Sequence, residues 1–418
     1  MEAGPRPTTG AAARLLDLSR LFSRVGRGAF TGVDRVEAAY LDRLLDRSEA
    51  LFSVVRTPEG FSLMDRTGTA ELASRLSGAQ AWGRQDFKAR LRRKASPAQR
   101  AARADLRRLA LAHGTPRQLP ELCRAHLPNG TVWLNVGHSN LGPEMFDAVR
   151  AVPGATTSIL IHDVIPLDFP QFQRPGTVDA FAEKIRTVAR HAELVICNSE
   201  VTRADAERHF EAAGRVPPAL VAHLGVDLLP AADGPLPPEI DPARPWFLAL
   251  GTIEPRKNHA LILDIWDDFT RALPEDEIPT LVIAGRRGWR NEALFERLDT
   301  SPLVGRHIFE LPDLDDAAVG ALLAGARALL MPSLAEGFGL PPAEALALGT
   351  PAIVNDLPVY REVLGNNPVY ANVADRYSWA ETILDLARAD SKNQRAAEGA
   401  GFALPTWQEH FNLVLKVT

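Results

Sequence analysis

The second half of the chain, from Trp246 onward, alternates short apolar runs with amphipathic stretches of helical length. This alternation is typical of a doubly wound parallel sheet, in which a helix follows each buried strand. The apolar runs predict strands over residues 246–251, 280–285, 307–311, 328–331, 352–354 and 369–370. The amphipathic stretches predict helices over residues 258–273, 291–298, 315–324, 341–348, 359–364 and 375–389.

The first half repeats this theme less regularly, with predicted strands over residues 14–18, 51–55, 132–136, 158–162, 194–197 and 220–222. Between the halves, six prolines and few large apolar side chains indicate a linker. We therefore expect an N-terminal Rossmann-like domain over 1–228, a linker over 229–245, a second such domain over 246–390, and a segment 391–418 that packs back on the N-terminal domain. The two domains would face each other across a cleft at the carboxyl ends of their strands, where open parallel sheets bind ligands.

Composition narrows the possible classes of function. The 418 residues are 46% hydrophobic and 24% charged, which suits a globular chain long enough for two cores. A formal net charge of -5 offers no general attraction to nucleic acid, so we expect no such partner. Cys123 and Cys197 belong to no metal-binding pattern, which favours a reducing compartment. Because neither a signal peptide nor an apolar run of about 18 residues is evident, we expect a cytoplasmic protein.

Residues 84–108 form a pronounced charge run, with ten Lys or Arg against only Asp86 and Asp105. One interpretation is a solvated helix pair whose long side chains cover apolar surface. The other is a surface that rests on anionic lipid, because each basic residue near such a membrane adds about 1 kcal/mol of attraction. The second interpretation predicts peripheral contact with the inner face of the membrane, and both stay open.

The most informative segment runs from Glu336 to Glu344, just after a predicted strand. Gly337 and Gly339 allow close backbone approach, and the Pro-Pro pair that follows suits the first turn of a helix. The free amides of such a helix start attract phosphate. The two carboxylates, eight residues apart, can accept charge-assisted hydrogen bonds from hydroxyl groups of one ligand. A capping Glu and a solvent-facing Glu are the alternative, which the Gly-Phe-Gly and Pro-Pro residues disfavour.

A second candidate site follows the first strand of this half, where Arg256 and Lys257 lead directly into a helix. Because the dipole of a helix start repels cations, this pair suggests an anion that offsets the repulsion. Two solvated charges in a turn are the alternative. Gly285 and Arg286 follow the next strand and are candidates for lining a nucleotide base or its phosphates.

Two candidate positions lie in the first half. His162 ends a predicted strand beside Asp163 and is expected to point into the cleft, although a lone histidine there is as often structural as catalytic. Thr31 and Gly32 lie between the first strand and a predicted helix over residues 36–46, in the position of a phosphate loop. A plain turn with a helix cap explains Thr31 and Gly32 equally well.

Together these motifs resemble retaining glycosyltransferase family four. The stronger matches are Gly251–His259, Ala284–Trp289, the Glu-x7-Glu spacing of Glu336 and Glu344, and Gly225-Val226-Asp227; weaker ones are His162–Pro166 and Thr31–Glu37. The resemblance implies an α/β protein of the GT-B fold, in which two Rossmann-like domains face across a cleft. It also implies that the C-terminal domain holds a nucleotide-sugar donor and that the N-terminal domain binds the acceptor.

The same resemblance implies individual roles. Glu336 would bind hydroxyls of the transferred sugar, Glu344 the ribose and Lys257 the diphosphate. The catalytic set so implied is His162, Lys257 and Glu336, and the donor-binding set is Thr31, Gly32, Arg256, Lys257, Gly285, Arg286, Glu336, Gly337, Phe338, Gly339, Leu340 and Glu344. The family often places an Arg after the first glycine of the donor domain, where this chain has Thr252, so we expect Arg256 to take its place.

Charge development in the reaction favours catalysis without a metal. As the nucleoside diphosphate leaves, the sugar becomes oxocarbenium-like and negative charge gathers on the leaving oxygens. Arg256, Lys257 and the amides of residues 337–340 can neutralise that charge, so we expect no metal and no cofactor beyond the nucleotide-sugar co-substrate. Since no nucleophile is evident in the first half, same-face attack is the favoured route to retention of configuration.

Residues 286–289 and the His162-Asp163 pair resemble mannosyltransferase-like enzymes of bacterial polysaccharide assembly. We therefore expect transfer of mannose from GDP-mannose to a glycan or lipid-linked glycan acceptor, with GDP-fucose, dTDP-rhamnose or a UDP-sugar as alternative donors. A non-catalytic scaffold subunit that binds a nucleotide sugar is the alternative from another class. An epimerase is disfavoured by Glu-x7-Glu, and a phosphorylase by the lack of a clear pyridoxal-binding lysine segment.

Overall fold

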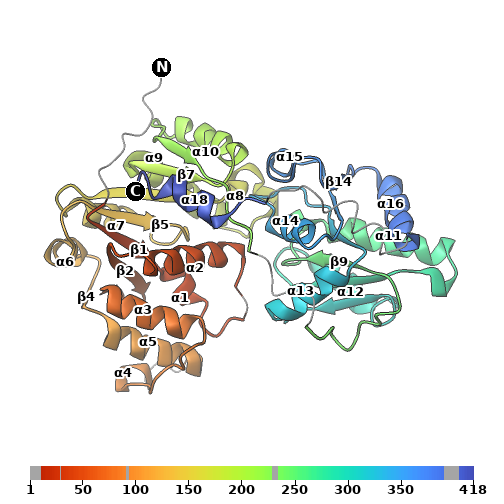
Figure 1. Cartoon of the computed structure of the whole chain (residues 1–418), viewed down its shortest axis with the longest axis horizontal. Coiled ribbons are helices and arrows are strands. Elements are labelled where there is room, and N and C mark those ends of the chain that lie inside the picture. Colours follow the sequence, from red (N-terminus) through yellow and green to blue (C-terminus); the bar gives the residue numbers. More distant parts are fainter. Residues whose placement is uncertain (1–10, 29, 91–93, 228–233, 390–403) are drawn as a thin grey trace.

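The computed structural model describes residues 11–28, 30–90, 94–227, 234–389 and 404–418. Its strands form an eight-stranded sheet in the first half and a six-stranded sheet in the second. Figure 1 shows the two sheets as the centres of two lobes, each flanked by helices. The expected α/β fold with two Rossmann-like domains is thereby confirmed.

The N-terminal sheet has the order β4-β3-β2-β1-β5-β6-β7-β8. Its parallel strands are β1 (Ala13–Asp17), β2 (Ala50–Thr57), β5 (Thr131–Asn135), β6 (Thr156–Ile161), β7 (Leu194–Cys197) and β8 (Ala219–Val221). At one edge, β3 (Gly60–Met64) and β4 (Ala112–Gly114) pair antiparallel. The sequence predicts neither of these strands, because the three residues Ala-His-Gly of β4 have little strand propensity and depend on pairing with β3.

Helices cover both faces of the N-terminal sheet in Figure 1. They are α1 (Ser19–Ser23), α2 (Gly32–Leu45), α3 (Arg66–Leu76), α4 (Phe87–Arg90), α5 (Pro97–Leu109), α6 (Leu119–His126), α7 (Pro143–Arg150), α8 (Ile165–Asp168), η1 (Pro170–Phe172), α9 (Thr177–His191) and α10 (Glu200–Ala212). The predicted helix over residues 36–46 is α2, which begins four residues earlier because Thr31 and Asp34 form a capping box.

The C-terminal sheet has the order β11-β10-β9-β12-β13-β14, with all pairs parallel. Its strands are β9 (Trp246–Leu250), β10 (Thr280–Ala284), β11 (Ile308–Leu311), β12 (Ala328–Met331), β13 (Ala352–Val354) and β14 (Val369–Tyr370). Its helices are η2 (Pro255–Lys257), α11 (His259–Ala272), η3 (Glu275–Glu277), α12 (Glu292–Thr300), α13 (Asp316–Gly325), α14 (Leu340–Ala347), α15 (Pro358–Leu364) and α16 (Arg376–Arg388). The strand predictions are confirmed to within one residue at each end, because buried parallel strands are continuous apolar runs bounded by turns.

The junction of the two halves falls between Val221 of β8 and Trp246 of β9. Within the predicted linker 229–245 and the predicted C-terminal segment 391–418, residues 229–233 and 391–403 lie outside the described residues. Beyond them, α18 (Trp407–Val414) packs on the N-terminal domain against α2, where the ring centroids of Phe411 and Tyr40 are 4.9 Å apart. None of the described helices is both long and apolar enough to span a lipid bilayer.

The basic segment 84–108 contains α4 and α5, and ion pairs engage several of its cations. Arg107 bonds to Asp86 at 2.6 Å, and Arg103 lies 3.5 Å from Glu59. At the tip, the side chain of Phe87 is 77% exposed beside the exposed Lys88. Residues 91–93 lie outside the described part of the chain.

A buried hydrogen bond attaches α18 to α2. The Nδ1 of His410 lies 3.0 Å from the carbonyl oxygen of His223 and 3.2 Å from that of Ala222, so Nδ1 carries the proton. The Nε2 of His410 is therefore the acceptor for the Tyr40 hydroxyl, which lies 2.7 Å away. Burial lowers the pKa of His410 to about 4 and keeps the ring neutral at neutral pH.

Replacing Tyr40 by Phe removes this donor and leaves a buried nitrogen without a partner. We expect Tyr40→Phe to lower the free energy of unfolding of the N-terminal domain by about 1–3 kcal/mol in urea titrations. The matched control is Tyr377→Phe, at a side chain that is 74% exposed, which should change it by less than about 0.5 kcal/mol. Equal effects of the two substitutions would mean that α18 is held by other contacts.

Candidate functional site

A buried carboxylate, that of Glu336, lies between the loops that follow β9 and β12. Its Oε1 accepts hydrogen bonds from Lys257 Nζ at 2.6 Å and from Ser333 Oγ at 2.7 Å. Its Oε2 accepts one from Arg256 Nη1 at 2.8 Å. The predicted residues Arg256, Lys257 and Glu336 are thus brought together, and both cations bond to the Glu336 carboxylate.

The opposite charges in this cluster stabilise one another's ionised forms. Burial by itself would raise the pKa of Glu336, but Arg256 and Lys257 lower it to about 2. Burial lowers the pKa of Lys257, and the opposite charge of Glu336 limits that change. Arg256 also lies 2.7 Å from the carboxylate of Glu254, so its guanidinium is held between two acids. The cluster is therefore a fixed set of charges at the carboxyl edge of the sheet.

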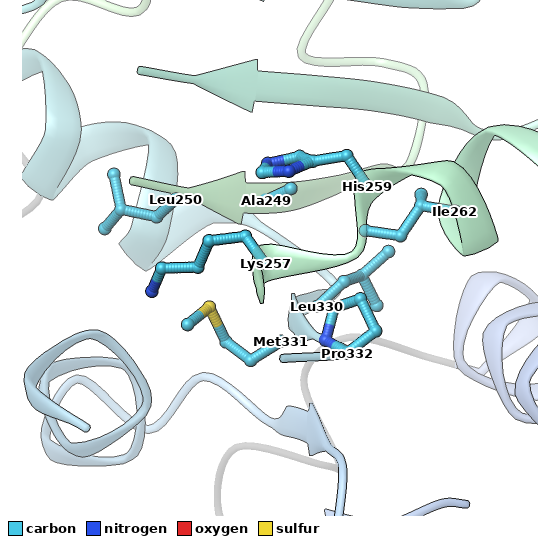
Figure 2. A pocket seen from close by; sticks show the side chains of 8 residues that line it. All are labelled: Ala249, Leu250, Lys257, His259, Ile262, Leu330, Met331 and Pro332. Atoms are coloured by element: carbon cyan, nitrogen blue, oxygen red, sulfur yellow. The ribbon is translucent and has the colours of Figure 1, made fainter. Parts of the chain in front are cut away.

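Figure 2 shows the Lys257 side chain extended along the end of β9, between Leu250 and Met331. A small pocket lies against it, lined by Ala249, Leu250, Lys257, His259, Ile262, Leu330, Met331 and Pro332. The Nδ1 of His259 is buried there without a hydrogen-bond partner. Burial, and then the charge of Lys257, lower the pKa of His259 to about 3, so this ring is neutral.

The glycines after Glu336 shape the start of α14. Gly339 precedes the helix with φ of +100°, a left-handed conformation that favours glycine, and a Cβ on it would lie 2.7 Å from Tyr360 Cε1. Phe338 is buried and packs edge-on against the His223 ring, whose centroid is 6.1 Å away. Leu340 is the first residue of the helix. This segment therefore positions the helix start at the domain boundary.

The loop holding Gly337 touches the N-terminal domain at the predicted His162-Asp163 pair. A Cβ on Gly337 would lie 2.7 Å from the His162 carbonyl oxygen and 3.2 Å from Asp163 Oδ2. The Thr202 hydroxyl donates to the Gly337 carbonyl oxygen at 3.3 Å. Burial raises the pKa of Asp163, and the charge of Arg256 opposes that rise, which places Asp163 in the field of the cluster.

The imidazole of His162 is buried, and its Nε2 donates to the Val136 carbonyl oxygen at 2.7 Å. Burial lowers the pKa of His162 to about 4. The ring is therefore neutral, with its proton on Nε2 and an unprotonated Nδ1. The His162 carbonyl oxygen accepts from Asn198 Nδ2 at 2.9 Å, which fixes the backbone that faces Gly337.

Thr31 and Gly32 begin α2, opposite the start of α14. Both the amide and the hydroxyl of Thr31 donate to Asp34 Oδ2, at 2.8 and 2.7 Å, so the cap expected as an alternative is present. A Cβ on Gly32 would lie 3.4 Å from Leu340 Cδ1. One turn into α2, Arg35 Nη1 donates to Glu344 Oε1 of α14. The two helix starts therefore meet across the domain boundary.

Gly285 and Arg286 follow β10, and Gly285 packs against Gly251, on which a Cβ would lie 3.6 Å from Lys257 Nζ. Gly285 leaves no room for a side chain, because a Cβ there would lie 2.0 Å from the Gly251 carbonyl oxygen. Arg286 Nε donates to Asp313 at 2.8 Å, and its Nη1 donates to the Arg27 carbonyl oxygen at 2.7 Å. In this structure Gly285 serves close packing of two strand ends, and Arg286 bridges the domains.

The site also contains residues that the motifs do not single out. Glu254 and Ser333 hold Arg256 and Glu336, and Arg35 holds Glu344. Polar residues in loops at the ends of predicted parallel strands are the signal that could have found Glu254 and Ser333. The partner of Arg35 is 309 positions away, and no local pattern indicates it. The described residues include no group of three or more His, Cys, Asp or Glu side chains that could hold a metal ion.

Two Rossmann-like domains with a site between them define the GT-B architecture. The structure superposes on Anabaena Alr3699/HepE, solved in complex with UDP and glucose, with a TM-score of 0.59 and 15% identity over 97% of each chain. It superposes on an Escherichia coli trehalose-6-phosphate structure bound with UDP-2-fluoro glucose with a TM-score of 0.58 and 13% identity, over 97% of this chain and 96% of that one. These likenesses establish the fold.

Residues 237–400 match the family model of glycosyl transferases group 1. The chain is 31% identical over 274 residues to the serotype-specific mannosyltransferase WbdA of Escherichia coli, covering 60% of this chain and 31% of WbdA. It is 34% identical over 144 residues to the O-antigen chain mannosyltransferase RfbU of Salmonella typhimurium, covering 34% and 38% of the two chains. The resemblance to glycosyltransferases is confirmed, while the chain spans about a third of the length of these relatives.

Proposed function

We propose that this chain is a retaining glycosyltransferase that transfers mannose from GDP-mannose to a glycan or lipid-linked glycan acceptor in polysaccharide assembly. The observation that carries the proposal is the meeting of Arg256, Lys257 and Glu336 with the start of α14, directly across from His162 and Asp163. A donor bound there would present its sugar to the N-terminal domain. The mannosyltransferase relatives favour mannose.

Each group in the site has a task suited to its chemistry. Lys257 gives one of its three N–H donors to Glu336, so two remain for the oxygens of a diphosphate. Glu336, held ionised, can accept hydrogen bonds from sugar hydroxyls. Glu344 would bind the ribose from α14. These assignments rest on position and charge and agree with those implied by the resemblance.

Retention of configuration follows if the acceptor hydroxyl attacks from the face that the leaving diphosphate occupies. As the bond between the sugar and the diphosphate breaks, the leaving oxygen gains negative charge that Arg256 and Lys257 stabilise. An acceptor hydroxyl that approaches the anomeric carbon from the same face would give its proton to the leaving oxygen, and its own oxygen would form the new bond to that carbon. Because the leaving group itself takes the proton, the imidazole of His162, which is bonded to the Val136 carbonyl oxygen, need not act as the base.

We place this activity in the cytoplasm, since the buried Cys123 and Cys197 are both free thiols. The exposed Phe87 and Lys88 at the tip of the basic segment 84–108 would bring the enzyme to anionic lipid, where a lipid-linked acceptor is anchored. An apolar ring beside a cation suits the interface between head groups and acyl chains.

A donor panel tests the proposed activity. With GDP-mannose, GDP-fucose, dTDP-rhamnose and UDP-glucose offered separately, we expect release of GDP from GDP-mannose above all others, slowly with water and faster with a mannan-type acceptor. The product linkage, read by NMR, should keep the anomeric configuration of the donor. Tight binding without turnover of any donor would instead favour a scaffold subunit, and an inverted product would exclude same-face attack.

In the same assay, Lys257→Ala should lower kcat by about 10² to 10³, as loss of a preorganised charge typically does. Its matched control is Arg271→Ala at the far end of α11, where the 72%-exposed side chain pairs with Asp268 of the same helix and turnover should be unchanged. Melting temperatures would verify that both variants fold. Full activity of Lys257→Ala would remove Lys257 from the diphosphate site.

Metal independence has its own test. Because Arg256 and Lys257 supply the positive charge, turnover of GDP-mannose should change by less than about two-fold in excess EDTA. A magnesium-dependent nucleotide-sugar transferase assayed in parallel verifies that chelation is complete. A rate that collapses in EDTA and recovers with Mg²⁺ or Mn²⁺ would contradict the proposal.

Membrane contact can be measured by co-sedimentation with vesicles that contain or lack phosphatidylglycerol. Wild-type protein should sediment with the anionic vesicles, and the double variant Phe87→Glu, Lys88→Glu should lose most of that binding, since each cation near the surface contributes about 1 kcal/mol. Arg271→Glu, a charge reversal on the other domain, should bind like wild type. If the double variant also binds like wild type, the proposed membrane contact of the segment 84–108 is wrong and the segment is a solvated helix pair.

A further inference from the structure

The interaction between Arg35 and Glu344 joins the two domains inside the candidate donor site. Arg35 lies on α2 of the N-terminal domain, and its Nη1 donates to Glu344 Oε1 on α14 of the C-terminal domain. The Glu344 side chain is 3% exposed, while that of Arg35 is 25% exposed. Arg35 therefore reaches from the rim of the boundary to a carboxylate that is otherwise covered.

Glu344 depends on Arg35 for its charge. Burial raises the pKa of Glu344, and the charges of Asp227 and Asp316 raise it further. The guanidinium of Arg35 acts in the opposite direction through its charge and its hydrogen bond. A buried carboxylate that loses its cation is strongly destabilised. Arg35 is thus the group that favours the ionised form of Glu344.

The contact leaves binding capacity on Glu344. It uses Oε1 of Glu344, and an ionised carboxylate has a second oxygen that can accept hydrogen bonds from hydroxyl groups. A pair of neighbouring hydroxyls, as on a ribose, could therefore donate to the second oxygen of Glu344 while Arg35 holds the first.

We propose that Arg35 is a positioning residue for the nucleotide: it holds the Glu344 carboxylate, from the opposite domain, in the orientation that binds ribose hydroxyls. Nucleotide affinity then depends on contact between the domains, although Glu344 belongs to the C-terminal domain alone. This inference rests on the proposed function, because it takes Glu344 as the ribose ligand.

Arg35 could instead block the site, so that the nucleotide must displace it. In that case Arg35→Ala would strengthen nucleotide binding. Displacement would leave Glu344 buried near Asp227 and Asp316 without the cation that opposes them. Because that state is high in free energy, we expect the nucleotide to bind Glu344 while the Arg35–Glu344 ion pair stays intact.

Calorimetric titration with GDP distinguishes these roles. We expect Arg35→Ala to weaken GDP binding about 10-fold or more, as loss of a hydrogen bond to a charged group does, with Arg35→Lys in between. Arg35→Gln, which keeps most of the side-chain volume, serves if the Ala variant does not fold. The control is Arg186→Ala, whose ion pair with Glu183 lies within α9 and away from Glu344.

Two further measurements separate positioning from a general structural effect. In a Glu344→Gln background, adding Arg35→Ala should change GDP affinity by less than about two-fold, because Arg35 acts through the carboxylate. In the single Arg35→Ala variant, loss of the cation raises the pKa of Glu344, so GDP affinity should begin to fall at a higher pH than in wild type as the solution is acidified.

GDP affinity that is unchanged or higher in both Arg35→Ala and Arg35→Gln would overturn the positioning role. An undiminished effect of Arg35→Ala in the Glu344→Gln background would overturn it as well. If wild-type protein binds neither GDP nor UDP, the proposed function itself fails, and the inference about Arg35 fails with it.

Discussion

The buried carboxylate of Glu336 is the interaction on which the arrangement of the site depends. A charge removed from water must be paired and hydrogen-bonded, and Lys257, Arg256 and Ser333 meet that need with three short contacts. These partners come from the loops after two adjacent strands, β9 and β12. Moving either loop would leave a buried charge unpaired. The cluster therefore fixes the two loops relative to each other. A nucleotide sugar bound as proposed would meet two cations and a carboxylate that already have fixed positions, which would lower the cost of ordering them during the reaction.

The domain boundary is built from polar contacts at helix starts. Glu362 of α15 accepts hydrogen bonds from the amides of Glu200 and Val201 at 2.7 and 3.0 Å, and thereby supplies a negative charge to the positive end of α10. The same carboxylate lies 2.9 Å from His223 Nε2, close to where the chain leaves the N-terminal domain. The Arg35–Glu344 pair is a second example. Such contacts tie the charge state of one domain to the position of the other, so ligand binding and domain contact are expected to be energetically coupled.

The N-terminal residues of the candidate site show how a residue can meet the other domain without offering its side chain to it. The imidazole of His162 is committed to the Val136 carbonyl oxygen, while its backbone meets Gly337. Thr31 caps its own helix and thereby fixes the turn that carries Gly32 toward Leu340. In both places a hydrogen bond inside the domain sets the geometry that the other domain then contacts.

The sequence by itself determined the strands of the C-terminal domain, because continuous apolar runs bounded by turns have few other stable arrangements. It also predicted that Glu336 and Lys257 bind one ligand, since glycines, prolines and paired charges at strand ends have a local physical meaning. Only the tertiary structure decided that these two side chains bond to each other, that β3 and β4 add an antiparallel edge, and that Arg35 reaches Glu344. Each of these depends on segments that the local pattern does not relate, and their pairing is set by packing and burial once the chain has folded.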